Sequence, residues 1–463
     1  MTSPGRARLL GPAMLGVASG AVLVPLNSTM LAVALPSIMD DFGIDAGTVS
    51  TLVTLYLGTV TIALLASGSL GDRYGQRPVF LVGVVAFAVS SLIAALAPTF
   101  AVLTLARVLQ ALSGALISTT SVALVRALAP PDRRGAAFGL FDMVVSISAA
   151  IAPFVGGVLV GAFGWQSLFL LAVPFAIFAG VTVGFLAPPT ATTEVEQGAP
   201  RRPVPIDVGG LVLLAGLMVS LLLAIRGIAD RGPLLLAALA VPILLVAFVR
   251  YELSVERPAV DPRLFNSHGF SAAVLGVLGT TVVLHASFIL VPLLVEELQG
   301  GTAEVAGLVL LGISGTWAIA APFGGRLSDR LGRRRPVVAG SICLTAGLVG
   351  LWLVAGTSTA LVVGILLAVV GFGMGFAGSP RQAAAMDAIP ADRVGMAAGT
   401  YYTGRYLGGV LGASLAGAVL GATVTAAAVT LGFGLLVLVG VAVVAVSFGL
   451  PDRVTSRAER AVA

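Results

Sequence analysis

Four titratable side chains interrupt long apolar runs of the sequence, namely Arg107, Asp142, His285 and Arg405. An arginine inside a membrane costs about 2.5–3.5 kcal/mol on insertion scales, so it is expected to face a polar interior or a partner. Arg107 is therefore a candidate for gating proton transfer or contacting an anion, and Arg405 for contacting substrate. Histidine titrates near neutral pH, and a carboxylate also carries protons, so His285 and Asp142 are candidates for proton coupling.

Each of these residues also has a structural interpretation. Arg107 and Arg405 can serve only as hydrogen-bond donors to neighbouring helices. His285 can be a satisfied polar residue that lines a cavity. Asp142 lies near one end of its apolar run and fits a charge network with the adjacent loops better than it fits proton carriage.

Neutral polar and aromatic residues accompany the charged ones. Asn27 and Gln110 are expected to line a cavity and to hydrogen-bond substrate or water, with hydrogen bonds between helices as the alternative. Tyr401 and Tyr402 precede Arg405 closely in the chain. One of the two tyrosines is expected to stack on substrate, with simple packing as the alternative.

The apolar runs that must position these residues dominate the chain. Hydrophobic residues make up 58% of the 463 residues and charged residues 10%, with a mean hydropathy of +1.06. A spanning helix needs roughly 20 apolar residues, and lipid requires each segment to satisfy its own backbone. We therefore predict an all-α membrane protein with fourteen spans, at about 11–36, 49–70, 79–97, 99–122, 136–160, 165–187, 207–226, 232–250, 270–294, 304–324, 336–355, 358–378, 394–419 and 424–449.

The sequence also excludes several kinds of chemistry. All 26 basic residues are arginine, so neither a P-loop lysine nor a Schiff-base lysine is present. The single cysteine, Cys343, cannot form an intrachain disulfide. The two histidines show no metal-ligand spacing, and no nucleophile constellation is found. We expect no cofactor, no metal, no enzymatic activity and no nucleic-acid partner.

The distribution of arginine predicts the orientation of the chain. Loops that face the cytoplasm are rich in arginine. With the N-terminus inside, arginines fall almost entirely in the inner loops and ends, Arg381 being counted among them, and only Arg226 and Arg231 fall outside. Both termini are therefore predicted to be cytoplasmic, and the first helix is predicted to be uncleaved.

Two polar stretches divide the chain. Residues 188–206 are rich in Pro, Thr and Glu and lack periodicity, which predicts a flexible linker. A second linker is predicted at 251–268. The predicted organisation is an N-terminal six-helix bundle, an inserted helix pair and a C-terminal six-helix bundle, with the bounds 1–187, 207–250 and 269–450, followed by a tail at 451–463.

The two six-helix blocks repeat a short motif between their second and third helices. Residues 68–78 read GSLGDRYGQRP, and residues 325–336 read GRLSDRLGRRRP. Internal duplication, with a site between the halves, is a known plan of transporters. The residues that carry the motif are Gly68, Asp72, Arg73, Gly75 and Arg77 in the first copy and Gly325, Asp329, Arg330 and Arg333 in the second.

This repeated motif resembles the most diagnostic motif of the major facilitator superfamily. The resemblance implies a transporter that works by alternating access, in which the loop motif locks the two halves in one state. The pair Arg107-x-x-Gln110 is similar to the buried arginine motif of the family's 14-helix drug-exporter branch. The fifth helix resembles its antiporter motif through Gly139, Pro153, Gly156 and Gly157.

The resemblance implies an exporter of amphipathic small molecules in the cell membrane, coupled to proton entry and acting as a monomer. The alternatives are a lipid or glycolipid exporter on the same fold, a nutrient symporter, which the antiporter motif disfavours, and a non-transporting receptor. One departure concerns Asn27, which stands where the branch commonly has aspartate. Because asparagine cannot titrate, we hypothesise that His285, its approximate repeat counterpart, carries the proton. The scarcity of carboxylates favours neutral or anionic substrates over dications.

Overall fold

The structure, a computed structural model, describes residues 11–128, 134–187, 207–230, 236–255, 258, 260–354, 359–389, 394–421 and 424–451. Within these ranges the regular elements are helices, and no strand occurs. Each of the fourteen predicted stretches falls on a helix. Eleven helical segments are long and apolar enough to cross a membrane by length and composition, so the chain is a multi-pass membrane protein.

The helices follow the sequence in the order α1 Pro12–Met30, α2 Leu35–Phe42, α3 Ala46–Tyr74, α4 Gln76–Ala95, α5 Phe100–Leu128, α6 Arg134–Phe163, α7 Gln166–Leu186, α8 Val208–Asp230, α9 Leu236–Ser254, α10 His268–Leu293, α11 Ala303–Leu331, α12 Arg334–Val354, α13 Ala360–Asp387, α14 Val394–Leu420 and α15 Ala426–Ser447. A 3₁₀ turn at Leu31–Ala34 joins α1 to α2. It lies just before Pro36, whose missing N–H interrupts the helical hydrogen bonds.

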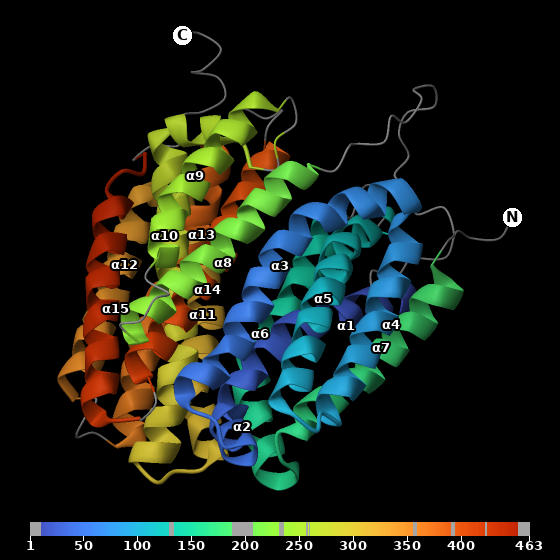
Figure 1. The fold of residues 1–463 in the computed structure, drawn as a ribbon. Coiled ribbons are helices and arrows are strands. Elements are labelled where there is room, and N and C mark those ends of the chain that lie inside the picture. Colours follow the sequence, from blue (N-terminus) through green and yellow to red (C-terminus); the bar gives the residue numbers. More distant parts are fainter. Residues whose placement is uncertain are drawn as a thin grey trace, which may run out of the picture.

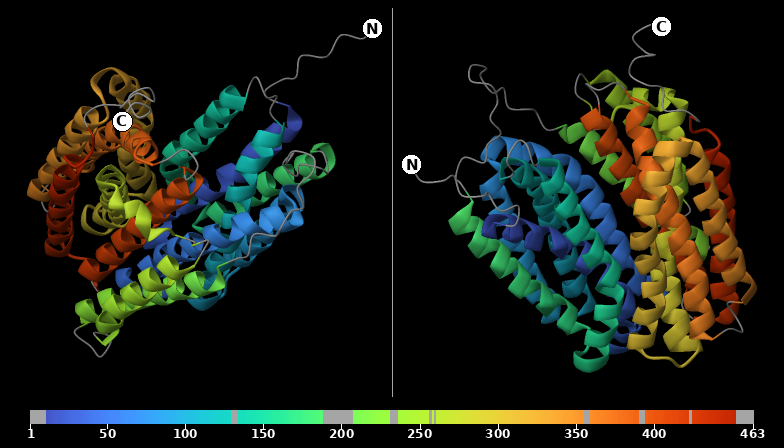
Figure 2. Two further views of the ribbon diagram at one scale, coloured as in Figure 1. Left: turned by 90° about the horizontal axis from the view of Figure 1, so that it is seen from above. Right: turned by 180° about the vertical axis from the view of Figure 1, so that it is seen from behind.

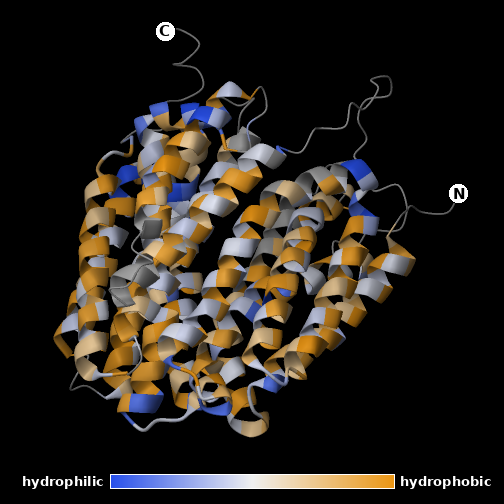
Figure 3. Ribbon diagram, viewed as in Figure 1, coloured by the Kyte–Doolittle hydropathy of each residue, from blue (hydrophilic) through white to orange (hydrophobic). Residues whose placement is uncertain are grey.

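The helices form two groups. Helices α1 to α7 contact one another, and so do helices α10 to α15. Figure 1 shows the first group in blue to green and the second in yellow to red. Hydrophobic residues predominate along the helices in Figure 3, and the most hydrophilic ones lie mainly near the helix ends. Apolar side chains such as Val82, Phe185 and Leu361 are largely exposed. A helix that is apolar on all sides is suited to lipid.

The two groups meet mainly through α6 with α11 and α3 with α14. The hydroxyl of Ser314 on α11 donates to the carbonyl of Ala150 on α6 over 2.7 Å. The Gly47 N–H at the start of α3 donates to the carbonyl of Gly421 over 3.2 Å. These contacts lie in the half of the molecule away from Pro12. We call the two ends the Pro12 end and the far end, and Figure 2 shows the groups diverging from the far end towards the Pro12 end.

The helix pair α8–α9 packs on one side of this seam. Helix α8 contacts both α3 and α14. Its apolar side chains Leu214, Leu217 and Met218 cluster with Phe248 of α9, and Leu407 of α14 packs against them. The pair therefore touches both groups. The predicted linker 188–206 lies outside the described residues, as do part of 251–268 and nearly all of the tail.

One sequence-based assignment is wrong. Arg381 was counted among the arginines of the inner loops, but helix α13 continues to Asp387 instead of ending near residue 378. Arg381 is consequently inside this helix and only 2% exposed. The hydropathy of the sequence drops several residues before the helix ends. The helix continues past this point because the guanidinium of Arg381 is buried against polar side chains of neighbouring helices.

Candidate functional site

A buried polar cluster in the first group surrounds Arg107 on α5. The Nη1 atom of Arg107 donates to the side-chain oxygen of Asn27 on α1 and, over 3.0 Å, to that of Gln110. Gln110 in turn donates over 2.8 Å to the hydroxyl of Ser91 on α4. Arg107 and Gln110 are three residues apart and so lie on one face of α5. The structure thus brings together Asn27, Arg107 and Gln110, three residues that the sequence analysis had singled out.

The guanidinium of Arg107 is contacted only by neutral groups among the described residues. Its guanidinium carbon lies 4.1 Å from the ring centre of Tyr56 and 6.0 Å from that of Phe169, an arrangement typical of a cation–π interaction. Among the described residues no carboxylate pairs with it, and its Nε atom and the hydroxyl of Tyr56 are buried without a partner. The cluster therefore holds a cation with unused hydrogen-bonding capacity, which suits it to an anion or a proton-bearing group.

A second set of polar residues lies on α10, α11 and α14 of the second group. The guanidinium carbon of Arg405 lies 5.7 Å from the ring of Trp317. The backbone carbonyl of Arg405 accepts a 2.8 Å hydrogen bond from Thr281. Tyr401 is buried and Tyr402 is 40% exposed, so Tyr402 is the better placed of the two tyrosines to meet a ligand.

His285 lies where α10, α14 and α3 meet. Its Nδ1 atom is 3.0 Å from the carbonyl oxygen of Thr281, so Nδ1 carries the hydrogen and Nε2 is the acceptor. A Cβ on Gly409 would lie 3.1 Å from the imidazole and 3.0 Å from Leu57 of α3. The histidine is therefore at the contact between the two groups, whereas Asn27 lies within the first group.

The two copies of the loop motif have the same backbone turn. Gly75 and Gly332 take φ values of +93° and +82°, a region that favours glycine. Each copy anchors an arginine within its own group: Arg77 donates to the carbonyl of Gly184 on α7, and Arg333 pairs with Asp387 over 3.1 Å. The motif therefore joins a loop to a distant helix of the same group.

Among the other residues predicted from the sequence motifs, some are exposed and others have side chains that lie outside the described part of the structure. Arg73 and Arg330 are exposed, and Gly325 lies in α11. The backbones of Asp72, Asp142 and Asp329, and of Gly68 and Gly139, lie in helices, but their side-chain surroundings fall outside the part of the chain that the structure describes. The roles predicted for them remain predictions.

Two of the residues that resemble an antiporter motif, Pro153 and Gly157, lie at the seam. A Cβ on Gly157 would come within 2.4 Å of the carbonyl oxygen of Ala303, and one on Gly307 within 2.5 Å of that of Pro153. Gly156 faces α1, where a Cβ would lie 3.2 Å from the Cα atom of Met30. Only glycine permits such close approach of two backbones. The motif thus serves the packing of α6 against both α1 and α11.

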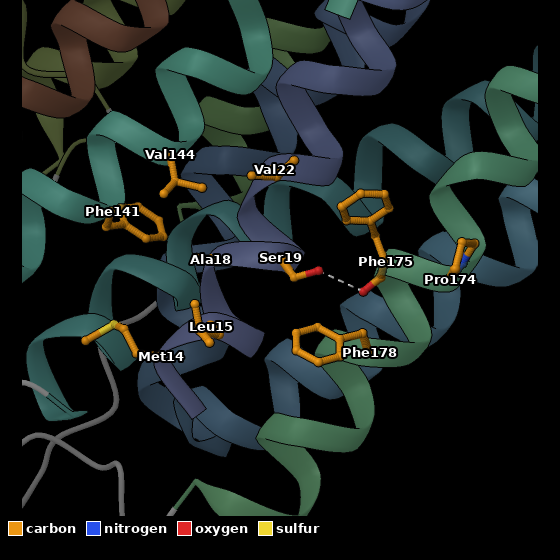
Figure 4. A pocket seen from close by; sticks show the side chains of 10 residues that line it. All are labelled: Met14, Leu15, Ala18, Ser19, Val22, Phe141, Val144, Pro174, Phe175 and Phe178. Carbon is orange, nitrogen blue, oxygen red and sulfur yellow. Dashed lines mark hydrogen bonds between the residues drawn. The ribbon is translucent and has the colours of Figure 1, made fainter. Parts of the chain in front are cut away.

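An apolar groove lies apart from these polar sites. It has a volume of about 460 Å³ and is lined by α1, α6 and α7, with Leu15, Phe175 and Phe178 at its exposed rim (Figure 4). Its one hydroxyl, on Ser19, is taken up by a 3.1 Å hydrogen bond to the carbonyl of Phe175. The groove offers hydrocarbon contact only, so it is part of the lipid-facing surface rather than a site for polar chemistry.

Two helix groups that meet at a seam are the plan of many multi-pass membrane transporters. The family model described as Major Facilitator Superfamily matches residues 17–413, and the chain belongs to that family. The solved D-xylose-proton symporter has the same fold, with a TM-score of 0.67 at 14% identity over 95% of this chain and 98% of that one.

Curated relatives are transporters rather than enzymes. The tetracenomycin C resistance and export protein of Streptomyces glaucescens is 30% identical, over 87% of this chain and 74% of that protein. The multidrug resistance protein Stp of Mycobacterium tuberculosis is 31% identical, over 85% and 72%. The riboflavin transporter RibZ of Clostridioides difficile is 28% identical, over 85% and 84%. The predicted family resemblance is thereby confirmed.

Proposed function

We propose that the protein is a secondary exporter of amphipathic small molecules that works by alternating access and proton antiport. The observation that carries this proposal is the seam between α6 and α11, where Gly157 and Ala303 bring two backbones into contact. Residues that resemble an antiporter motif thus form part of the contact that must open and close. The names of two relatives support export over uptake.

The arginine distribution orients the molecule in this proposal. The Pro12 end faces the cytoplasm, and all fourteen helical segments span the cell membrane. Because the hydrogen bonds from Gly47 to Gly421 and from Ser314 to Ala150 lie towards the far end, the structure corresponds to an inward-facing state. Substrate would then enter from the cytoplasm or the inner leaflet and leave after the seam opens.

We assign the proton-coupling and substrate-binding roles from the positions of the buried polar residues relative to the two helix groups. His285, at the junction of α3, α10 and α14, carries the proton, and Arg107 with Asn27 forms the buried polar site of the first group. Arg405 and the exposed Tyr402 contact the substrate. A histidine between two moving groups changes its surroundings when they separate, and such a change alters its affinity for a proton.

Dye efflux from cells that lack their own pumps tests the proposal. Neutral, anionic and cationic fluorescent compounds would be loaded, and their loss followed with and without a protonophore. Efflux that stops with the protonophore is expected. Efflux that persists would contradict proton coupling, and no efflux of any compound would favour the second candidate, a lipid or glycolipid exporter. The apolar groove lined by α1, α6 and α7 (Figure 4) is the observation in favour of that candidate.

A further inference from the structure

Arg381 is the centre of a polar cluster that the proposed function does not use. Its Nη1 atom donates over 2.6 Å to the hydroxyl of Thr280 on α10, and its Nη2 atom over 3.2 Å to that of Ser341 on α12. Ser341 also shares a 3.1 Å hydrogen bond with Ser447 on α15. The arginine thus ties four helices of the second group together.

These partners leave the charge of Arg381 uncompensated. Thr280 donates its own hydrogen to the carbonyl of Gly276, and Ser447 donates to that of Val443, so both hydroxyls are neutral and engaged. The Nε atom is buried without a partner. No described carboxylate pairs with Arg381. A cation held only by neutral groups in a poorly polarisable interior keeps a strong field around it.

The arrangement repeats that of Arg107 at the other end of the molecule. In each group an arginine on the fourth helix bonds to a side chain of the first helix and is linked to a serine of the third, Asn27 and Ser91 in one case and Thr280 and Ser341 in the other. Arg107 lies near the far end of α5, whereas Arg381 lies near the Pro12 end of α13. The two cations therefore occupy opposite depths.

Tyr401 lies between the face of α13 that carries Arg381 and the exposed ring of Tyr402. Tyr401 is buried in one apolar cluster with Ala377 and Ala384 of α13, which lie on the same face of that helix as Arg381. The ring of Tyr401 packs edge-on against that of Tyr402 at 6.1 Å, and the Tyr402 hydroxyl accepts a 3.2 Å hydrogen bond from Gln382. Tyr402 and Gln382 are exposed. Arg405 follows Tyr402 by three residues on α14, so this aromatic and amide surface lies beside Arg405, with Tyr401 between the surface and Arg381.

We propose that this surface is a binding site for amphipathic aromatic anions, in which Arg405 contacts the acidic group, Trp317 and Tyr402 contact the rings, and Arg381 acts from behind Tyr401 as a specificity-determining charge. The inference rests on the proposed function and names its substrate class. An acid entering the site gains from two positive charges at once, whereas a neutral ester of the same shape gains from neither.

Equilibrium binding of pyrenebutyrate and of its methyl ester to the purified full-length protein tests the site. Energy transfer from tryptophan to the pyrene reports binding and does not depend on transport. The wild-type protein is expected to bind the acid about tenfold more tightly than the ester. Equal affinities for acid and ester would overturn the inference without any variant.

Two kinds of variant separate charge from packing. Arg381→Gln removes one of the two charges and is expected to reduce the preference for the acid severalfold, while Arg381→Lys restores much of it. Thr280→Val and Ser341→Ala keep the charge but remove the hydroxyls that accept its hydrogen bonds. They should therefore lower the affinities for acid and ester alike. If Arg381→Gln lowered both affinities equally, Arg381 would have only a structural role.

The outcomes also distinguish the proposed binding site from the proposed export function. Preferential acid binding without efflux of any compound would support the site and contradict the proposed function. Efflux of neutral and anionic compounds by a protein with no preference for the acid would support the exporter and overturn the site.

Discussion

Arg107 on α5 donates a hydrogen bond to the side-chain oxygen of Asn27 on α1, and both side chains are almost completely buried. Asn27→Ala would leave the guanidinium with Gln110 as its only hydrogen-bond acceptor among the described residues. Hydrogen bonds to charged groups contribute roughly 1.5–3 kcal/mol, so we expect a loss of about 2 kcal/mol in the free energy of unfolding and a loss of transport. Thermal unfolding in detergent measures the first, and efflux the second.

Asn27→Asp is the matched variant, because it keeps the acceptor and adds a charge. A buried guanidinium gains from a carboxylate at hydrogen-bond distance, so this variant should remain folded and at least as stable as the wild type. Unfolding temperatures as low as those of Asn27→Ala would mean that Arg107 does not depend on this contact.

The ring of Tyr56 beneath Arg107 gives a second prediction. Tyr56→Phe keeps the aromatic face and removes a hydroxyl that has no partner, so stability should change little. Tyr56→Leu removes the cation–π contact, which is worth about 1–2 kcal/mol for a desolvated pair. Thermal unfolding of the two variants side by side measures the difference. Equal losses would assign the role of Tyr56 to its volume rather than to its ring.

The seam glycine gives a third prediction. A Cβ on Gly157 would lie 2.4 Å from the Ala303 carbonyl, so Gly157→Ala should push α6 away from α11 and lower the population of the state closed at the far end. Gly399→Ala on α14 is the control, because a Cβ there meets nothing within 4 Å. Cross-linking of cysteines introduced on either side of the seam, after Cys343→Ala, reports the closed population. Equal cross-linking in the two variants would contradict the role of Gly157.

His285 gives the fourth prediction. His285→Gln keeps a polar side chain but cannot titrate near neutral pH. We expect it to retain substrate binding and to lose the dependence of transport on the proton gradient. Uptake into inside-out vesicles at several external pH values measures this dependence. An unchanged pH profile would remove His285 from the coupling mechanism and leave Asp142 as the next candidate.

The sequence predicted the helices and much of the first cluster, since hydropathy marks spans and motif spacing places Arg107 and Gln110 on one face. It did not predict the partners that come from distant helices. In the sequence, Tyr56 and Trp317 look like ordinary aromatic residues on apolar helix faces. Only the packing of the helices shows that each ring lies against a guanidinium group. Arg381 was missed because polar residues depress hydropathy at the end of α13 even though the helix and its burial continue.

The most direct test of proton-coupled export uses the purified protein in proteoliposomes with an imposed pH gradient. With the interior acidic, molecules whose Pro12 end faces outward should accumulate the fluorescent substrate inside. A protonophore should abolish this accumulation, and His285→Gln should do the same while leaving substrate binding intact. Accumulation that is equal with and without the gradient would contradict the mechanism proposed here.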